Sequence, residues 1–328
     1  MVRQRAAESR TVASFADLFE ATVDNVTRVI QGKEQAIRLA LVCLVSQGHL
    51  LIEDVPGVGK TTLAKALARS LGCDWHRIQF TPDLLPSDVT GVTVYNRQTG
   101  TFTFRPGGIF ANVVLGDEIN RASPKTQAAL LEAMEERQVT VDSTTYRLPA
   151  PFMVIATQNP VEHEGTYPLP ESQLDRFLLR IRMGYPDRAA EIDMLDAHGG
   201  GNQAVDELLP VLSPVDVESM VETTKAVHVA PALKGYIVDL AAATRRHPAL
   251  ALGMSPRAAL ALQRAARALA ASRGREYVVP DDIKALMGPV LEHRLALSAD
   301  AQLSGGRGPD VLGEVLASVP VPTGRSGA

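Results

Sequence analysis

The stretch EDVPGVGKTT, residues 53–62, decides the fold of this chain, because it joins a glycine-rich turn to a lysine and two threonines. The usual phosphate-binding pattern is a glycine, four residues, and then Gly-Lys followed by Ser or Thr. Gly59, Lys60 and Thr61 fit this pattern, but Asp54 stands where the first glycine belongs. The apolar run HLLIE before the turn predicts a buried strand, and TLAKALARSLG after it predicts a helix. Strand, turn and helix together are the context that a phosphate loop requires.

Such a turn presents backbone N–H groups and a helix N-terminus to phosphate. We expect Lys60 to reach the β- and γ-phosphates of ATP and the Thr61 hydroxyl to ligate Mg²⁺. A carboxylate about 8 Å from a phosphate charge costs roughly 2 kcal/mol per charge, so the Asp54 side chain is expected to point away from the nucleotide. Replacing Asp54 by glycine is then expected to change ATP affinity little. The residues predicted to contact the nucleotide in this loop are Pro56, Gly57, Val58, Gly59, Lys60, Thr61 and Thr62.

Apolar runs alternate with amphipathic stretches over the first half of the chain. Buried strands are expected at HLLIE, HRIQF, IFANVVLGDE, FMVIATQNP and RFLLRIRM, and helices at 36–48, 62–72 and 123–136. Hairpins are expected in VTVYNRQTGTFTF and around Asp-Ser in QVTVDSTTYRL. Strands that alternate with helices predict an α/β fold with a mainly parallel sheet and right-handed crossovers.

The pattern of predicted secondary structure changes after Pro186. Strand-like runs vanish, and alanine-rich helical patterns follow at 187–198, 214–227, 231–246, 256–272 and 281–296. We therefore expect four segments: a disordered tail at 1–14, an α/β core at 15–185, an all-α domain at 186–304 and a tail at 305–328 that holds one short helix near 311–318.

Polar side chains follow the ends of several predicted strands. Asp117 and Glu118 close one strand, where the first carboxylate can hold Mg²⁺ and the second can act as general base on water. An ordinary acidic turn is the alternative interpretation of this pair. Asn159 ends another strand, where it can orient the same water. Arg176 and Arg257 begin later elements, and each is of the type that neutralises charge on a transferring phosphoryl group.

Composition narrows the class of protein. With 45% hydrophobic and 21% charged residues the chain is typical of globular proteins, and it holds no apolar run of about 18 residues that would span a membrane. The start MVRQRAAESR does not resemble a signal peptide, and two cysteines make neither a disulfide framework nor a zinc site. These features predict a cytoplasmic protein. The net charge of -4 argues against a dedicated nucleic-acid binder.

The order of motifs resembles that of a known family. GVGKTT, GDEINRA, ATQNP, QLDRF and GMSPRA follow one another as in the AAA+ ATPases. DLLPSDVTG and FRPGGIFANVVLGDEINRASPKTQAALLEAMEE are similar to the MoxR branch, and the resemblance covers about residues 18–298. It implies a P-loop ATPase core with a mainly parallel sheet, a C-terminal all-α lid, ATP and Mg²⁺ as cofactors, and assembly into a ring that is usually a hexamer.

The resemblance also implies roles for single residues. Lys60 and Thr61 match the Walker A lysine and threonine, and Asp117 and Glu118 match the Walker B acids. Asn159 matches sensor 1, Arg176 matches the arginine finger, and Arg257 matches sensor 2. The segment that usually lies near adenine is matched by Gln31, Gly32 and Lys33. Segments 83–106 and 138–148 match inserts that commonly face the ring pore or the substrate. Asp54 and Gly116 depart from the family's pattern, and the small Gly116 is expected to loosen its strand end.

For the biological role, the resemblance favours a chaperone-like ATPase that remodels or matures a client protein, or helps insert its cofactor or metal. Its expected partner is a protein with a von Willebrand factor A domain. A magnesium-chelatase-like motor subunit is the main alternative. A nucleic-acid motor or loader, and a structural role without hydrolysis, are further alternatives that the acidic charge and the presence of Glu118 and Arg176 disfavour.

Overall fold

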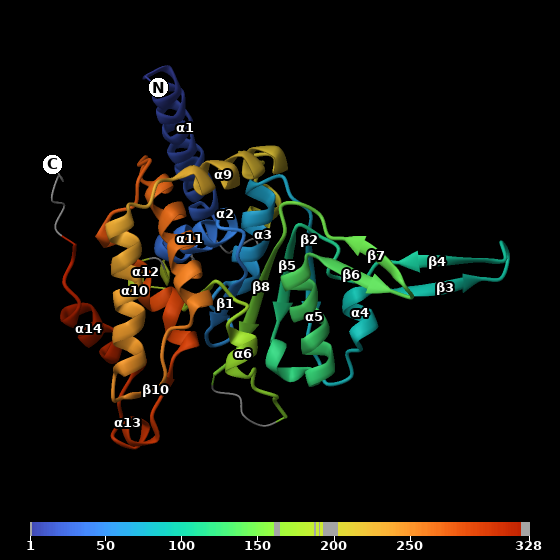
Figure 1. Cartoon of the computed structure of the whole chain (residues 1–328). Coiled ribbons are helices and arrows are strands. Elements are labelled where there is room, and N and C mark those ends of the chain that lie inside the picture. Colours follow the sequence, from blue (N-terminus) through green and yellow to red (C-terminus); the bar gives the residue numbers. More distant parts are fainter. Residues whose placement is uncertain (1, 161–164, 187, 190, 193–202, 323–328) are drawn as a thin grey trace. The chain divides into compact units, whose positions relative to one another are not determined.

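The protein is described by a computed structural model, which covers residues 2–160, 165–186, 188–189, 191–192 and 203–322. The chain forms two compact units (Figure 1). An α/β unit comprises Leu18–Phe177 and Ile181–Ser219, and a helical unit comprises Met1–Asp17, Leu178–Arg180 and Met220–Ala328. Residues 203–219, which the sequence assigns to the second domain, group with the α/β unit in this division.

A five-stranded sheet has the order β2-β5-β8-β1-β9. Its strands are β1 (Leu50–Glu53), β2 (Trp75–Gln79), β5 (Val113–Asp117), β8 (Met153–Gln158) and β9 (Leu179–Ile181). The pairs β1–β8, β5–β8 and β2–β5 are parallel, so the predicted mainly parallel sheet is confirmed. Glu53 lies opposite Gln158, and Gln79 lies opposite Asp117, so the carboxyl ends of these four strands share one edge.

Three helices of the α/β unit carry its main apolar faces: α2 (Glu34–Val45), α3 (Lys60–Ser70) and α5 (Pro124–Glu136). The Ser123 hydroxyl accepts a hydrogen bond from the Thr126 N–H at 3.4 Å, which caps α5 as its Ser-Pro start predicts. One buried cluster joins α5 to the sheet, with Leu51, Val114, Val154, Leu130, Leu131 and Met134 among its members. Short helices complete this unit: α4 (Pro86–Thr90), η1 (Ile119–Arg121), α6 (Glu171–Leu174) and α8 (Gln203–Asp206).

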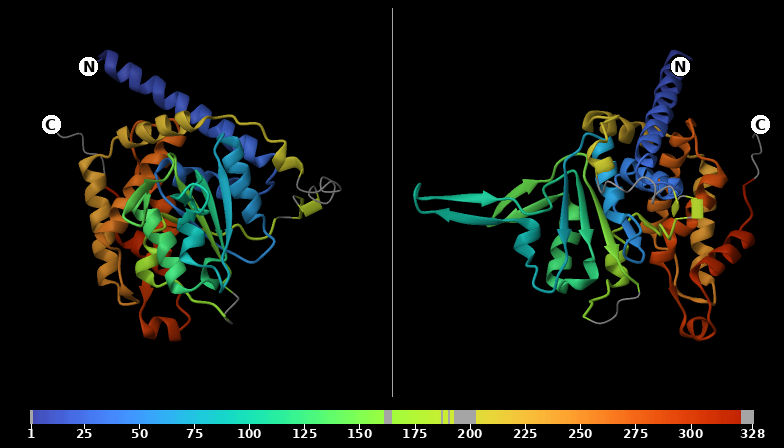
Figure 2. Two further views of the ribbon diagram at one scale, coloured as in Figure 1. Left: turned by 90° about the vertical axis from the view of Figure 1, so that its right-hand side faces the viewer. Right: turned by 180° about the vertical axis from the view of Figure 1, so that it is seen from behind.

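Both predicted hairpins form. One consists of β3 (Val92–Asn96) and β4 (Thr101–Arg105), the other of β6 (Gln138–Val141) and β7 (Thr144–Arg147). Asp142 and Ser143 join β6 to β7 with φ of 47° and 71°, the left-handed backbone that a two-residue hairpin turn needs. Figures 1 and 2 show the β3–β4 ribbon projecting from the α/β unit.

The helical unit is built from α10 (Pro231–Arg246), α11 (Pro256–Ser272), α12 (Pro280–Leu291), α13 (Ala299–Leu303) and α14 (Gly308–Ser318), while α9 (Pro214–Ala226) precedes them. The predicted bounds of α10 and α11 are confirmed. The helix predicted at 281–296 ends at Leu291, because η3 (Glu292–Arg294) follows and β11 (Ala296–Leu297) pairs with β10 (Leu250–Leu252). The predicted helix at 187–198 lies largely outside the described residues.

Both predicted tails contain helix in this structure. Helix α1 (Val2–Thr27) includes most of the segment 1–14, whose Ala, Arg, Gln and Glu residues favour helix and which has neither Gly nor Pro. Helix α14 buries Val311, Leu312 and Val315, an i, i+1, i+4 pattern that gives it one apolar face.

Over the described residues, no helix is both long and apolar enough to cross a membrane.

The helical unit contains a buried ionic cluster at the start of α12. The Asp282 side chain has no exposed surface, and its carboxylate accepts two hydrogen bonds from Arg275, at 2.6 and 2.7 Å. It also accepts hydrogen bonds from Arg273 at 3.0 Å and from the Val279 N–H at 2.9 Å. Breaking a buried pair by removing one partner costs far more than breaking an exposed one.

We expect Asp282→Asn to lower the free energy of unfolding by roughly 3 kcal/mol, because two arginines lose the charged acceptor that the fully buried Asp282 side chain provides. Chemical denaturation of the full chain measures this change. The matched control is Asp310→Asn, which breaks the exposed pair of Arg307 and Asp310 and should leave the unfolding midpoint unchanged. Equal midpoints for both variants would contradict the expectation.

Candidate nucleotide site

The phosphate loop connects β1 to α3. Gly57 and Gly59 have φ of +83° and +89°, a conformation that side chains other than glycine rarely adopt. Gly59 is the N-cap of α3, an 11-residue helix that begins at Lys60. The loop therefore has the local geometry in which N–H groups and a helix N-terminus face an anion.

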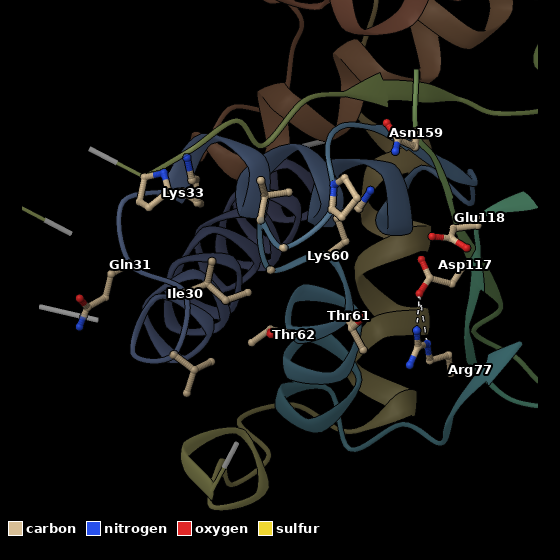
Figure 3. A pocket seen from close by; sticks show the side chains of 16 residues that line it. Ile30, Gln31, Lys33, Lys60, Thr61, Thr62, Arg77, Asp117, Glu118 and Asn159 are labelled. Carbon is tan, nitrogen blue, oxygen red and sulfur yellow. Dashed lines mark hydrogen bonds and ion pairs between the residues drawn. The ribbon is translucent and has the colours of Figure 1, made fainter. Parts of the chain in front are cut away.

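A cavity of about 460 Å³ lies against this loop, within the size range of sites for small ligands. Its lining residues are Val29, Ile30, Gln31, Lys33, Pro56, Gly57, Val58, Gly59, Lys60, Thr61, Thr62, Arg77, Asp117, Glu118, Asn159 and Pro186. Figure 3 shows Lys60 and Thr61 between the Ile30–Lys33 turn on one side and Asp117, Glu118 and Asn159 on the other. The structure thus brings together the predicted phosphate loop, Gln31, both acids and Asn159.

Three of the predicted site residues are not among these lining residues. Gly32 forms the turn between Gln31 and Lys33 with φ of +70°. Arg176 lies outside the described lining and forms an ion pair with Glu135 of α5 at 3.2 Å. Arg257 lies in the first turn of α11, in the helical unit.

Lys60 already has an internal partner. Its Nζ donates a hydrogen bond to the backbone carbonyl oxygen of Asp54 at 2.8 Å. A phosphate that binds in the loop would draw the ammonium group from a neutral acceptor to a charged one, and charge-assisted hydrogen bonds are the stronger kind.

Asp117 is held from two sides. Its Oδ1 accepts a hydrogen bond from the Thr157 hydroxyl at 2.6 Å, and its Oδ2 accepts from Arg77 Nη2 at 2.6 Å and Nε at 3.2 Å (Figure 3). Neither Thr157 nor Arg77 is among the site residues predicted from the sequence. Alternation in HRIQF and FMVIATQN could have pointed to them, because both lie on strands that pair with β5.

The residues present fit a magnesium ion. Asp117 is only 9% exposed, and its carboxylate lines the same cavity as the Thr61 hydroxyl. Within the described ranges no three His, Cys, Asp or Glu side chains cluster to hold a metal by themselves. That suits Mg²⁺, which usually binds one or two protein oxygens together with phosphates and water.

Glu118 begins the η1 turn with φ of +57°, a left-handed backbone that costs a non-glycine residue about 1 kcal/mol. Its N–H donates to the Thr157 hydroxyl at 2.9 Å, so this threonine fixes both acids. Its Oε2 accepts hydrogen bonds from Gln79 at 3.0 Å and Arg121 at 3.1 Å. The carboxylate therefore lies at the cavity with its charge partly compensated.

The two departures from the expected pattern have local explanations. Asp54 lies outside the cavity lining, as predicted, and its carboxylate faces backbone N–H groups instead. Gly116 is buried in β5, and a side chain there would meet the Phe80 ring at 3.3 Å. The expectation that Gly116 loosens the strand end is wrong, because Phe80 occupies the space.

We expect Arg77→Ala to lower, by about threefold, the Mg²⁺ concentration needed for half-maximal binding of a fluorescent nucleotide, because it frees an oxygen of Asp117. The Arg77 side chain is half exposed, and ion pairs screened by water in this way contribute up to about 1 kcal/mol. Titration of nucleotide binding with MgCl₂ measures the effect. Arg121→Ala is the control, since it removes a partner of Glu118 and leaves Asp117 untouched. A higher Mg²⁺ requirement in Arg77→Ala would show that Arg77 supports metal binding.

Comparisons with known proteins identify the family of this chain. Residues 49–179 match the ATPase family associated with various cellular activities (AAA), and residues 242–315 match the AAA lid domain. The chain is 50% identical to the uncharacterized protein YeaC of Bacillus subtilis (strain 168), over 94% of this chain and 96% of that protein. It is 42% identical to Chaperone MoxR1 of Mycobacterium tuberculosis, over 95% of this chain and 84% of that protein.

A solved structure supports the same conclusion. The crystal structure of a protein of Cytophaga hutchinsonii that is assigned as an ATPase superposes with a TM-score of 0.91 at 37% identity, covering 98% of this chain and 100% of that one. Protein MoxR of Methylorubrum extorquens is 34% identical over 90% of this chain and 93% of its own length. With its phosphate loop, paired acids and helical lid, the chain belongs to the MoxR family of AAA+ ATPases.

Proposed function

We propose that this ATPase hydrolyses Mg·ATP between neighbouring copies in a ring, rather than as an isolated chain, and uses the cycle to remodel client proteins. The observation that carries the ring is the position of Arg176. The cavity lining contains Lys60, Asp117 and Glu118, whereas Arg176 lies outside the described lining, paired with Glu135. An arginine that completes a phosphoryl-transfer site can come from a neighbour, and a head-to-tail contact of this kind closes into a ring.

The proposed chemistry assigns a task to each lining group. Lys60 binds the β- and γ-phosphates, while Thr61 and Asp117 hold Mg²⁺, which neutralises phosphate charge when bound. The oxygen of the attacking water bonds to the γ-phosphorus, and Glu118 takes a proton from that water as general base. The bond from that phosphorus to the bridging oxygen breaks, and ADP and phosphate leave. Asn159 orients the water.

The remaining predicted contacts concern the nucleoside and the lid. Gln31 and Lys33 line the cavity on the side away from Asp117, which suits a role near adenine (Figure 3). Gly32 supplies the turn between them. For Arg257 we propose the sensor 2 role, in which the lid arginine contacts the phosphates.

Remodelling is the role that the relatives favour. MoxR1, 42% identical to this chain, is described as a chaperone. The β3–β4 ribbon is suited to contact other polypeptides, because it projects from the α/β unit (Figure 2) and carries two exposed aromatic residues. Tyr95 is 52% exposed and Phe102 is 74% exposed. We further propose a cytoplasmic hexamer that works with a von Willebrand factor A domain protein on the maturation, or the cofactor or metal insertion, of its client.

The ring mechanism makes a specific kinetic prediction. Specific ATPase activity should rise with protein concentration, and Arg176→Ala should reduce it at least about 10³-fold while ATP affinity stays near that of the unaltered protein. Arg182→Ala, which removes an exposed arginine paired with Glu53, is the control and should retain activity. A monomeric fraction with full ATPase activity would contradict the proposal that neighbouring copies share the site.

The remodelling role is tested by capture. Glu118→Gln should bind ATP without hydrolysing it and so hold its client, whereas Lys60→Ala should bind neither. Both variants, tagged, are incubated with Mg·ATP in lysate of the source cell, and the captured proteins are compared by mass spectrometry. Enrichment of a von Willebrand factor A domain protein by Glu118→Gln alone supports the proposal. Enrichment of nucleic-acid machinery, or no ATP-dependent difference, contradicts it.

A further inference from the structure

Asp54 replaces the first glycine of the phosphate loop, and both of its carboxylate oxygens accept hydrogen bonds. Asp54 is 8% exposed, and its Oδ1 accepts a hydrogen bond from the Val55 N–H at 2.9 Å. Its Oδ2 accepts from the N–H groups of Met183 and Gly184, at 2.7 and 2.6 Å. Three backbone N–H groups therefore donate to one buried carboxylate, an arrangement that holds the carboxylate away from the cavity.

The segment that Asp54 holds leads directly to the nucleotide cavity. Met183 and Gly184 follow β9, and the next residue, Tyr185, accepts a hydrogen bond through its carbonyl oxygen from Lys33 Nζ. Pro186 then lines the cavity together with Lys33. Residues 183–186, the β9 exit segment, thus run from the Asp54 carboxylate to the wall of the cavity near Gln31 and Lys33.

Contacts on the other side of Asp54 reach the phosphate loop itself. Its carbonyl oxygen accepts from Lys60 Nζ, and its N–H donates to the carbonyl oxygen of Gln158 at 3.1 Å. The Met183 side chain lies 3.9 Å from where a Cβ on Gly59 would stand. One residue therefore joins the sheet, the phosphate loop and the β9 exit segment. A glycine at position 54 would keep the first two links, which its backbone makes, and lose the third, which needs the carboxylate.

We infer that Asp54 is a positioning residue for nucleotide binding. Its carboxylate fixes the β9 exit segment against the phosphate loop and so sets the width of the cavity at its nucleoside end. This inference rests on the proposed binding of ATP in the cavity. It revises the expectation that glycine at this position would change ATP affinity little, since glycine removes the carboxylate that accepts three backbone hydrogen bonds.

The test compares two ligands that fill different parts of the cavity. ATP should occupy both the phosphate loop and the wall near Pro186, whereas inorganic triphosphate contacts the loop alone. In Asp54→Gly and Asp54→Ala we expect ATP affinity to fall about tenfold and triphosphate affinity to change less than about twofold, because only the nucleoside wall has moved. At saturating ATP, kcat should be retained while KM rises.

Two further variants separate positioning from general damage. Asp54→Asn keeps a carbonyl oxygen that can accept from Met183 and Gly184, so it should restore most of the ATP affinity. Arg182 lies just before the exit segment. Arg182→Ala removes only the 3.4 Å ion pair that this exposed side chain makes to Glu53, and it should bind ATP like the unaltered protein. Thermal unfolding of each variant in the absence of ligand identifies any that fails to fold, and whichever of Asp54→Gly and Asp54→Ala folds then carries the comparison of the two ligands.

The outcomes distinguish this inference from the proposed function. If the unaltered protein binds no ATP, the proposed nucleotide site itself fails. If it binds ATP and Asp54→Gly binds equally or more tightly, the positioning role is overturned. Equal losses of ATP and triphosphate affinity would also overturn it, because Asp54 would then act on the phosphate loop alone.

Discussion

Parallel pairing of β1, β8, β5 and β2 is the constraint on which the site depends. Because these strands run in one direction, their carboxyl ends lie at the same end of the sheet, where ligands of open α/β sheets bind. Glu53 opposite Gln158 and Gln79 opposite Asp117 set that edge. The phosphate loop leaves β1 and the acids close β5, so the same register brings lysine and carboxylates to one cavity.

Every charged group that this register brings to the cavity edge already has a partner within the chain. Lys60 bonds to a backbone carbonyl, Asp117 to Arg77 and Thr157, and Glu118 to Gln79 and Arg121. Binding of Mg·ATP would therefore be an exchange of partners. Its net free energy is the difference between two sets of contacts, so residues that never touch the nucleotide can tune affinity.

Asp54 illustrates how a departure from a motif can be structural. A carboxylate beside a phosphate site is unfavourable if it faces the ligand. Here three backbone N–H groups take up its two oxygens, so its charge serves to connect segments that are 129 and 130 residues apart in the chain. The acid carries the link between phosphate loop and exit segment that the usual glycine lacks.

The sequence by itself determined the elements and the motif residues, because these follow from local patterns. Apolar runs between turns predicted the buried strands, the Ser-Pro start predicted α5, and the spacing in GVGKTT predicted a phosphate loop whose glycines indeed have positive φ. Local composition also misled: 281–296 looked helical throughout, but pairing of β10 with β11 ended the helix at Leu291.

Only the tertiary structure decided which residues surround those motifs. Thr157 between the two acids, Arg77 on Asp117, and Met183 and Gly184 on Asp54 come from other strands or from distant segments, and no pattern near the motif predicts them. The physical reason is that a hydrogen bond depends on where two groups lie in space. Sheet register and chain path set that separation, and both are decided by packing over the whole unit.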